Sequence, residues 1–486
     1  MTAPARPRPL GALKTLAAFR AHLQAQGVAL GCDEAVEVGP GAPLARAHRL
    51  GDGRLIGNRF CIHPMEGWDG TPDGRPSELT RRRWRRFGES GAKLIWGGEA
   101  VAVRADGRAN PNQLCLDRAT APSLGALRDE LAAAHRVRHG GDGDLLVGLQ
   151  LTHSGRFSRP APGPPQPRPA QAHPVLDRRF PDGVAVRVFS DDELDALAET
   201  FVDAAVLAAD AGFAFVDVKH CHGYLGHELL GCHTRPGRFG GALANRMRFL
   251  ELVVSGIRRR APALGIGVRV SAIDVVPFAR GPDGRGVPEP VALPYLHGFG
   301  VDAGRPTEPD LREPIAFLQR VRDLGIELVN ITAGSPYYNP HLQRPALYPP
   351  SDGYDPPADP LHFVAAQIAA TAALKRAVPE LFVIGTGYSY LQEFLPAVAQ
   401  NVIRTGGADA IGIGRLALSY PDFPADVLGG RPLDRHRLCR TFSDCTTGPR
   451  NGLPSGCYPL DPFYKERPDA VRVKALRPRA GTGAET

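Results

Sequence analysis

Short apolar runs alternate with amphipathic stretches along most of the chain. Each run is rich in Val and Ile, and a loop with glycine or polar residues follows it. Eight such runs occur, at 59–62, 93–96, 145–149, 213–218, 266–270, 327–331, 382–384 and 408–413. Runs that are apolar on both faces and lie between polar helices predict buried parallel strands with helical crossovers.

The clearest helix precedes the fourth run. Ser190 and Glu193 form a capping-box pattern, and apolar residues then recur at helical spacing from Leu194 until Gly212. Such an apolar stripe must face a sheet. Eight strands that alternate with helices predict an α/β fold, a closed (β/α)8 TIM barrel, with a doubly wound open sheet as the alternative.

The predicted barrel spans residues 44–430. Residues 1–43 form an N-terminal extension with a helical stretch at 13–27, and 47–58 has the pattern of a hairpin that leads into the first strand. Three long loops rich in Pro and Gly follow strands three, five and six, at 159–179, 280–310 and 334–360. They lie on the face where barrels bind ligands, so we expect them to wall or cover the substrate. Residues 431–466 form a post-barrel segment, and 467–486 are expected to be a flexible tail.

Composition adds information about compartment and partners. The 58 basic and 51 acidic residues give a net charge of +7, but the 52 Arg and 6 Lys are spread along the whole chain. This distribution argues against a nucleic-acid or membrane surface and favours a small-molecule substrate. Without an 18-residue apolar run, a cytoplasmic location is expected, and the eight cysteines do not form a disulfide framework. A homo-oligomer is compatible with the sequence.

Eight short motifs stand at the ends of the predicted strands. They are NRFCIHPME (58–66), GEA (98–100), QLTHSGR (150–156), HGYL (222–225), GGALANR (240–246), VRVS (268–271), GTG (385–387) and GIGR (412–415). In this order the chain, over about residues 44–424, resembles the old yellow enzyme family of FMN-dependent ene-reductases, in particular the branch related to 2,4-dienoyl-CoA reductase. The resemblance implies an NADH:flavin oxidoreductase that binds FMN, uses NAD(P)H, and passes hydride from flavin N5 to an activated C=C bond.

The resemblance also implies a set of FMN-binding residues. Those near the ring system are Pro64, Met65, Glu66, Ala100, Gln150 and Arg269, and those near the phosphate are Gly385, Gly387, Gly414 and Arg415. A guanidinium at the position of Arg269 would stabilise the negative charge of a reduced flavin. Taken alone, the glycines are equally explained by turns at strand ends, and Gln150 and Arg269 by a polar plug in the barrel.

Three residues are implied in catalysis. Tyr224 matches the family's proton donor, and a phenol with an ordinary pKa of about 10 is protonated at neutral pH. His222 matches one of two ligands of the substrate carbonyl. At the position of the other ligand this chain has Lys219 instead of His. Lys219 could bind an enolate oxygen, or pair with Asp217 or Glu228 and serve only structure.

A second departure from the family is Glu66, because relatives have Thr or Cys at this position beside the flavin. An ionised carboxylate there disfavours the electron-rich reduced ring, unless it is protonated or paired with a cation such as Lys219. We therefore expect an unusual reduction potential or an unusual substrate.

Two groups of metal-ligand residue types occur in the chain. Cys439, Cys445 and Cys457 resemble the iron–sulfur segment of the dienoyl-CoA reductase branch, but three thiolates are one too few, so no cluster is expected. The His-rich stretch at 220–233 lacks the remaining elements of a hydrolase metal site. Two alternative functions stay open: an FMN-dependent amine demethylase or dehydrogenase, and a metal-dependent TIM-barrel hydrolase.

Overall fold

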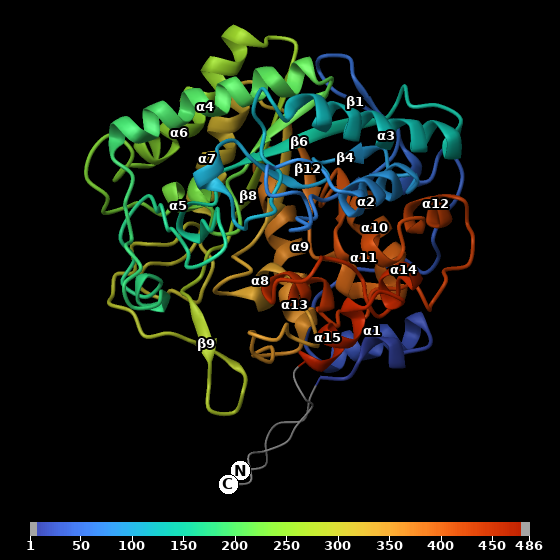
Figure 1. Ribbon diagram of the computed structural model, residues 1–486. Helices are drawn as coiled ribbons and strands as arrows, with labels where there is room; N and C mark the ends of the chain where they lie inside the picture. Colours follow the sequence, from blue (N-terminus) through green and yellow to red (C-terminus); the bar gives the residue numbers. More distant parts are fainter. Residues whose placement is uncertain (1–6, 478–486) are drawn as a thin grey trace.

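The computed structural model describes residues 7–477. Within this range the centre is a closed barrel of eight parallel strands (Figure 1). They are β3 (Phe60–Ile62), β4 (Leu94–Ile95), β6 (Leu146–Thr152), β7 (Phe215–Val218), β8 (Gly265–Ser271), β11 (Leu328–Thr332), β12 (Phe382–Gly385) and β13 (Ala410–Ile413). Strand β13 pairs with β3, β3 with β4, and β4 with β6, so the sheet closes on itself. The predicted (β/α)8 barrel is confirmed, and the open-sheet alternative is wrong.

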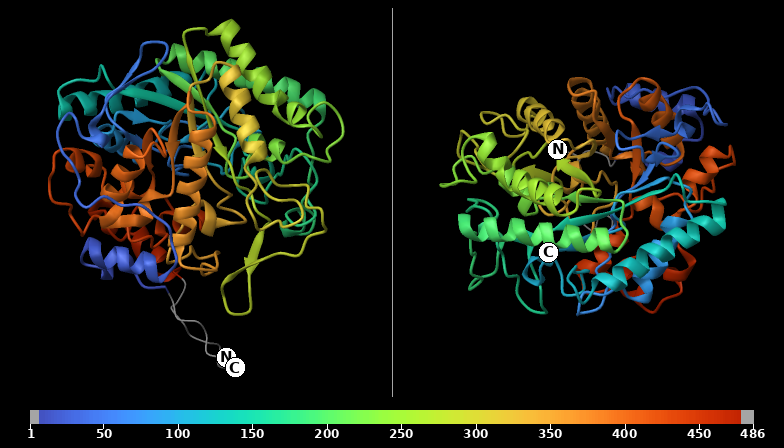
Figure 2. Two further views of the ribbon diagram at one scale, coloured as in Figure 1. Left: turned by 180° about the vertical axis from the view of Figure 1, so that it is seen from behind. Right: turned by 90° about the horizontal axis from the view of Figure 1, so that it is seen from above.

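Helices cover the outside of the barrel, as the view from above shows (Figure 2). The longer ones are α2 (Glu78–Gly88), α3 (Ala121–His139), α4 (Asp191–Asp210), α6 (Leu243–Arg260), α7 (Arg312–Asp323), α9 (Pro360–Ala377) and α10 (Leu395–Arg404). Helix α4 begins with the predicted capping box, in which Ser190 and Glu193 each bind the other's backbone N–H. Its apolar stripe, including Leu194, Leu197 and Phe201, is buried in the layer between strands and helices.

An antiparallel hairpin closes the amino-terminal end of the barrel. Strand β1 (His48–Arg49) pairs with β2 (Leu55–Ile56). Leu50 and Ile56 join the cluster that fills the barrel interior, together with Phe215 and Phe382. Since this end is filled by apolar side chains, a ligand can enter only at the carboxyl ends of the strands, as in other TIM barrels.

The second barrel strand is interrupted. Strand β5 (Ala100–Ala102) continues along β6 after β4, and the four residues between β4 and β5 bulge away from the sheet. Gly98 in the bulge has φ 56°, and a Cβ there would lie 2.3 Å from Cζ2 of Trp84. Only glycine fits this backbone, so the first residue of the GEA motif must be glycine for structural reasons.

The three long loops and the post-barrel segment cover the carboxyl end of the barrel. The loop after β8 carries the projecting hairpin of β9 (Phe278–Arg280) and β10 (Gly286–Pro288), and the loop after β11 carries α8 (Pro340–Gln343) (Figure 1). The post-barrel segment contains α13 (Asp444–Arg450), α14 (Pro462–Lys465) and α15 (Asp469–Ala475).

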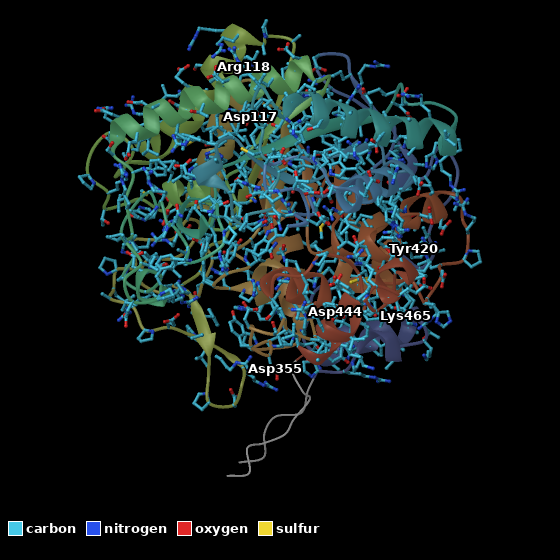
Figure 3. All side chains as sticks on the ribbon, in the orientation of Figure 1. Asp117, Arg118, Asp355, Tyr420, Asp444 and Lys465 are labelled. Carbon is cyan, nitrogen blue, oxygen red and sulfur yellow. The ribbon has the colours of Figure 1, made fainter. Side chains whose placement is uncertain are left out.

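Helix α15 lies inside the segment that was expected to be a flexible tail. Its Val473 is fully buried, and Arg477 forms an ion pair with Asp444 at the start of α13, which is labelled in Figure 3. Residues 469–477 therefore pack on the post-barrel segment, because an apolar side chain and a charge pair fix them there. The rest of the predicted tail, residues 478–486, lies outside the described residues.

The N-terminal extension contains the predicted helix, α1 (Leu16–Ala25). Phe19 of α1 stacks on Phe394 with ring centroids 4.3 Å apart. Asp33 then binds Arg404 at the end of α10. The extension thus packs on the segment after β12, where Phe394 ends a 3-10 helix (Tyr388–Phe394), and along α10 to its end. Within residues 7–477, every helix is too short or too polar to cross a lipid bilayer.

Candidate active site

A cavity of about 200 Å³ lies at the carboxyl ends of the barrel strands. Its walls come from the loops after β3, β7, β11, β12 and β13, from Arg269 within β8, and from the post-barrel segment. The predicted site residues that line it are Pro64, Met65, Glu66, His222, Arg269, Gly387, Gly414 and Arg415. Eight residues far apart in the sequence therefore meet at one cavity.

The remaining predicted site residues do not line this cavity. Ala100 and Gln150 are neighbours in the register of β5 and β6, and both are buried. Gly385 ends β12, where a Cβ would lie 2.8 Å from the hydroxyl of Tyr388. Tyr224 and Lys219 are buried next to Glu66, because Tyr224 contacts Glu66 and Lys219 lies over the Tyr224 ring.

Glu66 and Tyr224 come from different strand ends and meet in a hydrogen-bonded group. The hydroxyl of Tyr224 donates to Oε2 of Glu66 at 3.0 Å and lies 2.9 Å from the hydroxyl of Tyr337. Nζ of Lys219 lies 3.8 Å from the centroid of the Tyr224 ring. Phe157 stacks on Tyr337 at a centroid distance of 3.9 Å and fixes that ring. The carboxyl, the two phenols and the ammonium group therefore form one connected cluster.

Burial sets the protonation of this cluster. It raises the pKa of Glu66 above its usual value, although Lys219 and the hydrogen bond from Tyr224 oppose the shift. Burial, together with the nearby carboxyl of Glu66 and the phenol of Tyr337, raises the pKa of Tyr224 well above 10. The phenol of Tyr224 is therefore protonated at neutral pH, and Glu66 keeps its proton to a higher pH than an exposed glutamate does.

His222 stands at the turn between β7 and α5 (Leu225–Leu230) with φ 67°, a left-handed conformation that is uncommon for histidine. Two hydrogen bonds hold this turn: the backbone N–H of His222 donates to Ser271, and the hydroxyl of Ser335 donates to the carbonyl of His222. Nε2 of His222 lies 3.1 Å from the side-chain nitrogen of Gln343. Burial and the charges of Arg269 and Lys219 lower the pKa of His222 well below its usual value, so the imidazole is neutral.

Asp217 organises the polar groups under the cavity. Its carboxylate accepts hydrogen bonds from Gln150 at 2.6 Å, from the indole of Trp96 at 2.7 Å and from the backbone N–H of Arg269 at 2.7 Å. Burial raises its pKa to about 6 despite these donors. Because Asp217 is occupied by these donors, and Glu228 by Arg156, the structure places Lys219 on the Tyr224 ring instead of beside either carboxylate.

The cavity also contains three basic side chains. Nη1 of Arg415 and Nη2 of Arg344 are buried without a hydrogen-bond partner, and so is Nε of Arg269. The other amino group of Arg415 donates to the carbonyl of Pro345 at 2.7 Å, which fixes its direction. Burial and the neighbouring Arg450 and Arg415 lower the pKa of Arg344 to about 9, so this guanidinium group is still charged at neutral pH. Unpaired buried donors of this kind predict an anionic ligand.

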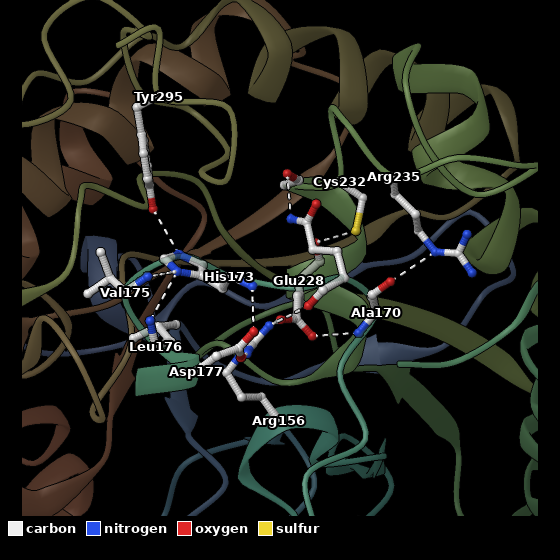
Figure 4. Close-up of polar contacts among 12 residues, drawn as sticks. Arg156, Ala170, His173, Val175, Leu176, Asp177, Glu228, Cys232, Arg235 and Tyr295 are labelled. Atoms are coloured by element: carbon white, nitrogen blue, oxygen red, sulfur yellow. Dashed lines mark hydrogen bonds and ion pairs between the residues drawn. The ribbon is translucent and has the colours of Figure 1, made fainter. Parts of the chain in front are cut away.

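A buried ion pair anchors the helix that carries Tyr224 at its N-cap. Arg156 of the QLTHSGR motif is 1% exposed; it binds Glu228 of α5 through Nε at 2.8 Å and also binds Asp177 (Figure 4). The second oxygen of Glu228 accepts from the backbone N–H of Ala170 at 2.8 Å. The loop after β6 is thereby tied to α5, so the position of Tyr224 depends on a charge pair outside the cavity.

The cysteines of the post-barrel segment lie close to the cavity. Cys445 lines it, and Cys439 and Cys457 are buried nearby in the same core cluster. Over the described residues, no group of three or more His, Cys, Asp or Glu side chains is arranged to hold a metal ion. In the His-rich stretch, Nδ1 of His220 binds the carbonyl of Val218, and Nδ1 of His227 accepts from the backbone N–H of Gly223.

Sequence reasoning missed several residues of the site. His63 lines the cavity and lies 3.1 Å from the amide nitrogen of Asn330; its place inside the HPME motif was a usable signal. Tyr337 and Arg344 come from the loop after β11, which carries no recognisable motif, so only the tertiary structure reveals them. A larger hollow of about 920 Å³ lies outside the barrel between α3 and α4, beside Asp117 and Arg118 (Figure 3), and contains none of the predicted site residues.

The fold is a TIM barrel whose cavity, at the carboxyl ends of the strands, carries buried guanidinium groups without partners. A model of the NADH:flavin oxidoreductase / NADH oxidase family matches residues 49–281. The chain is similar to this family and is an oxidoreductase. This assignment argues against the alternative of a metal-dependent hydrolase.

The curated relatives have low sequence identity to this chain, but their alignments cover most of it. An NADPH dehydrogenase of Geobacillus sp. (strain WCH70) is 25% identical over 380 residues, which cover 76% of this chain and 90% of the relative. A metal reductase of Desulforamulus reducens is 25% identical over 433 residues, which cover 88% of this chain but only 52% of that protein. The chain therefore spans about half the length of the larger relative.

Solved structures support the same fold. A 2-naphthoyl-CoA reductase in complex with 2-naphthoyl-CoA superimposes with a TM-score of 0.63 at 18% identity, over 87% of this chain and 57% of that one. Histamine dehydrogenase from Rhizobium sp. 4-9 also gives 0.63, at 21% identity over 87% and 53%. The old yellow enzyme homologue from Zymomonas mobilis gives 0.55, at 20% identity over 80% and 94%. At these identities the likenesses establish the fold.

Proposed function

We propose that the cavity binds FMN and that the protein reduces an activated C=C bond, in an enone or enoyl thioester, with electrons from NAD(P)H. The observation that carries the proposal is the set of unpaired, buried guanidinium donors at the carboxyl ends of the barrel strands. When bound, FMN would supply the hydride chemistry of the reaction.

The phosphate end of the proposed site is formed by the last two strand ends. Gly387 after β12 has φ 98°, and Gly414 precedes α11 (Arg415–Ser419). Glycine at these positions lets backbone N–H groups approach a phosphate closely, and loops seven and eight are the usual phosphate position of this fold. Arg415 and Arg344 would complete the site by donating their free N–H groups.

The ring end would lie between Pro64, Met65 and Arg269. The free Nε of Arg269 would favour negative charge on the pyrimidine side. In our proposal Ala100 and Gln150 support this end from behind, since Gln150 binds Asp217, which in turn holds the backbone of Arg269. Gly385 has the corresponding supporting role on β12.

The substrate carbonyl would be held by His222 and Lys219. A neutral imidazole donates a hydrogen bond without carrying charge, and the ammonium group of Lys219 favours the enolate that forms when hydride reaches the β-carbon. Tyr224 would then protonate the α-carbon, because its phenol is protonated at neutral pH and stands at the same strand end.

The test is anaerobic turnover of the FMN-loaded protein with NADH and NADPH. 2-Cyclohexen-1-one and cinnamoyl-CoA would be tested as electron acceptors, and histamine and trimethylamine would be tested in parallel as electron donors. The amines are included because histamine dehydrogenase shares the fold and represents the amine-oxidising alternative. We expect enone-dependent oxidation of the nicotinamide and no electron transfer from the amines. Tyr224→Phe should lower enone reduction by about 10²-fold, with NADPH-dependent flavin bleaching preserved. Colourless protein after incubation with excess FMN, or turnover of amines alone, would refute the proposal.

A further inference from the structure

The hydrogen bonds in the cluster of Glu66, Tyr224 and Tyr337 all run in one direction, from donor to acceptor. Tyr224 has a single hydroxyl proton, and the structure directs it to Oε2 of Glu66 at 3.0 Å. The hydroxyl of Tyr337, 2.9 Å away, can then only donate to the oxygen of Tyr224. Glu66 also lines the cavity, and its other oxygen, Oε1, is buried without a partner. Tyr224 is thus connected to the cavity wall through a carboxyl group.

We propose that Glu66 returns a proton to Tyr224 after each transfer, so that the two residues form a proton relay along the cavity wall. The inference rests on the proposed reduction of a C=C bond. When the O–H bond of Tyr224 breaks, its proton forms the new C–H bond at the α-carbon and leaves a phenolate. The carboxyl proton of Glu66 then moves to the phenolate oxygen, and the Glu66 carboxylate takes a proton from water. The electrons of the reduction arrive with the hydride and take no part in the relay.

Tyr224 needs a local proton source because it is 2% exposed. Two groups touch its hydroxyl, and their acidities decide which one serves. Tyr337 is a phenol whose own pKa is raised by burial and by the charge of Glu66. An ordinary carboxyl group is more acidic than a phenol by about six pH units. Proton return from Glu66 is therefore favoured, and Tyr337 acts by orienting the Tyr224 oxygen.

Lys219 favours the intermediate state of the relay. Its Nζ lies 3.8 Å from the centroid of the Tyr224 ring, where a positive charge stabilises a phenolate more than a neutral phenol. Lys219 is 5% exposed, so water screens this interaction only weakly.

The surroundings of Glu66 determine when it carries a proton. Lys219 at the end of β7 is the positive group that acts on Glu66, Arg269 on β8 lines the same cavity as Glu66, and His63 and His222 are neutral. Tyr224 and Tyr337 approach from the start of α5 and from the loop after β11, and Trp68, in the same loop as Glu66, also lowers the pKa of Glu66. Burial outweighs the positive groups and raises the pKa of Glu66. The relay should therefore persist to a higher pH than an exposed glutamate would allow, and fail as pH rises through this pKa.

Stopped-flow kinetics of the FMN-loaded Glu66→Gln variant tests the relay, with NADPH and 2-cyclohexen-1-one as probes. Tyr224 begins the first turnover with its own proton, so a single turnover of pre-reduced enzyme should proceed close to the wild-type rate. Steady-state turnover should fall by about 10²-fold, because each later cycle waits for proton return. Imidazole buffer should restore part of the loss. Tyr224→Phe should slow the first turnover as well, and Glu308→Gln, on the exposed surface, is the matched control.

Two measurements do not depend on the loss of activity in one variant. The wild-type steady-state rate should fall as pH rises through the Glu66 pKa. Glu66→Asp should show the same fall in rate, and Glu66→Gln should not show it. In oxidised holoenzyme labelled with 13Cζ-tyrosine, the Tyr224 resonance should shift as Glu66 titrates in the wild type and stay constant in Glu66→Gln.

The outcomes separate the relay from the proposed function. If wild-type holoenzyme does not reduce the enone, the proposed function is wrong, and the relay is wrong with it. If the wild type and Tyr224→Phe behave as expected but Glu66→Gln cycles normally, only the relay is refuted. An equal loss in the first and later turnovers of Glu66→Gln would also refute it, because Glu66 would then act directly on the cofactor or the substrate.

Discussion

Replacement of Arg415 by Gln should weaken FMN binding by an amount that the contacts of Arg415 define. One amino group of Arg415 is fixed by the carbonyl of Pro345 at 2.7 Å, and the other is buried without a partner. A phosphate at this position would gain a hydrogen bond from a charged donor, which contributes about 1.5–3 kcal/mol. Loss of this bond corresponds to a dissociation constant for FMN that is about 10- to 150-fold higher.

The assay is quenching of flavin fluorescence during titration with apoprotein, with FMN and riboflavin as paired ligands. Riboflavin has no phosphate, so its affinity should be the same for the wild type and for Arg415→Gln. Higher salt should weaken binding of FMN more than binding of riboflavin. Arg118→Gln, an exposed arginine outside the barrel, is the control and should change neither affinity. An equal loss for both flavins would refute the assignment of Arg415 to the phosphate.

Three further predictions concern other parts of the molecule. Glu66→Thr should raise the flavin reduction potential, and the rise should grow with pH, because the raised pKa keeps Glu66 neutral at lower pH. A shift of about 30 mV corresponds to 1.4 kcal/mol for two electrons. An unchanged potential in spectroelectrochemical titration would contradict this reasoning. Burial raises the pKa of Asp274 to about 7. As pH rises from 4 to 7, the free energy of unfolding of the wild type should therefore fall by up to about 4 kcal/mol more than that of Asp274→Asn. Equal decreases in urea titrations would disprove the raised pKa of Asp274. Gly98→Ala should destabilise the barrel by about 2 kcal/mol or more, because its Cβ would lie 2.3 Å from Trp84 and φ is 56°, and an unchanged urea midpoint would show that the bulge can relax.

Several elements followed from local sequence alone. Each of the eight predicted apolar runs overlaps an observed barrel strand, with bounds that differ by three residues or fewer. The capping box at Ser190 and the hairpin before β3 also form as predicted. These features depend on nearest neighbours and on a simple apolar pattern, so distant parts of the chain do not alter them.

Prediction was weaker where one residue depends on contacts from distant segments. The sequence predicts a flexible tail where α15 forms, because the few apolar residues there give no strong pattern. In the structure, the burial of Val473 and the ion pair between Arg477 and Asp444 fix this helix in place. Lys219 had two open roles in the sequence, and only the packed structure places it over the Tyr224 ring. In the same way, the strand register places Gln150 beside Asp217.

The sequence by itself determined the barrel, its ligand-binding end and eight residues of the cavity wall, because strand ends of a closed parallel barrel converge wherever the individual strands come from. The tertiary structure alone decided which side chains touch. It joined Glu66 to Tyr224 across 158 positions of the chain and brought Tyr337 and Arg344 from a loop without motifs. Hydrogen bonds, burial and pKa shifts arise from such three-dimensional neighbours, and no local pattern contains them.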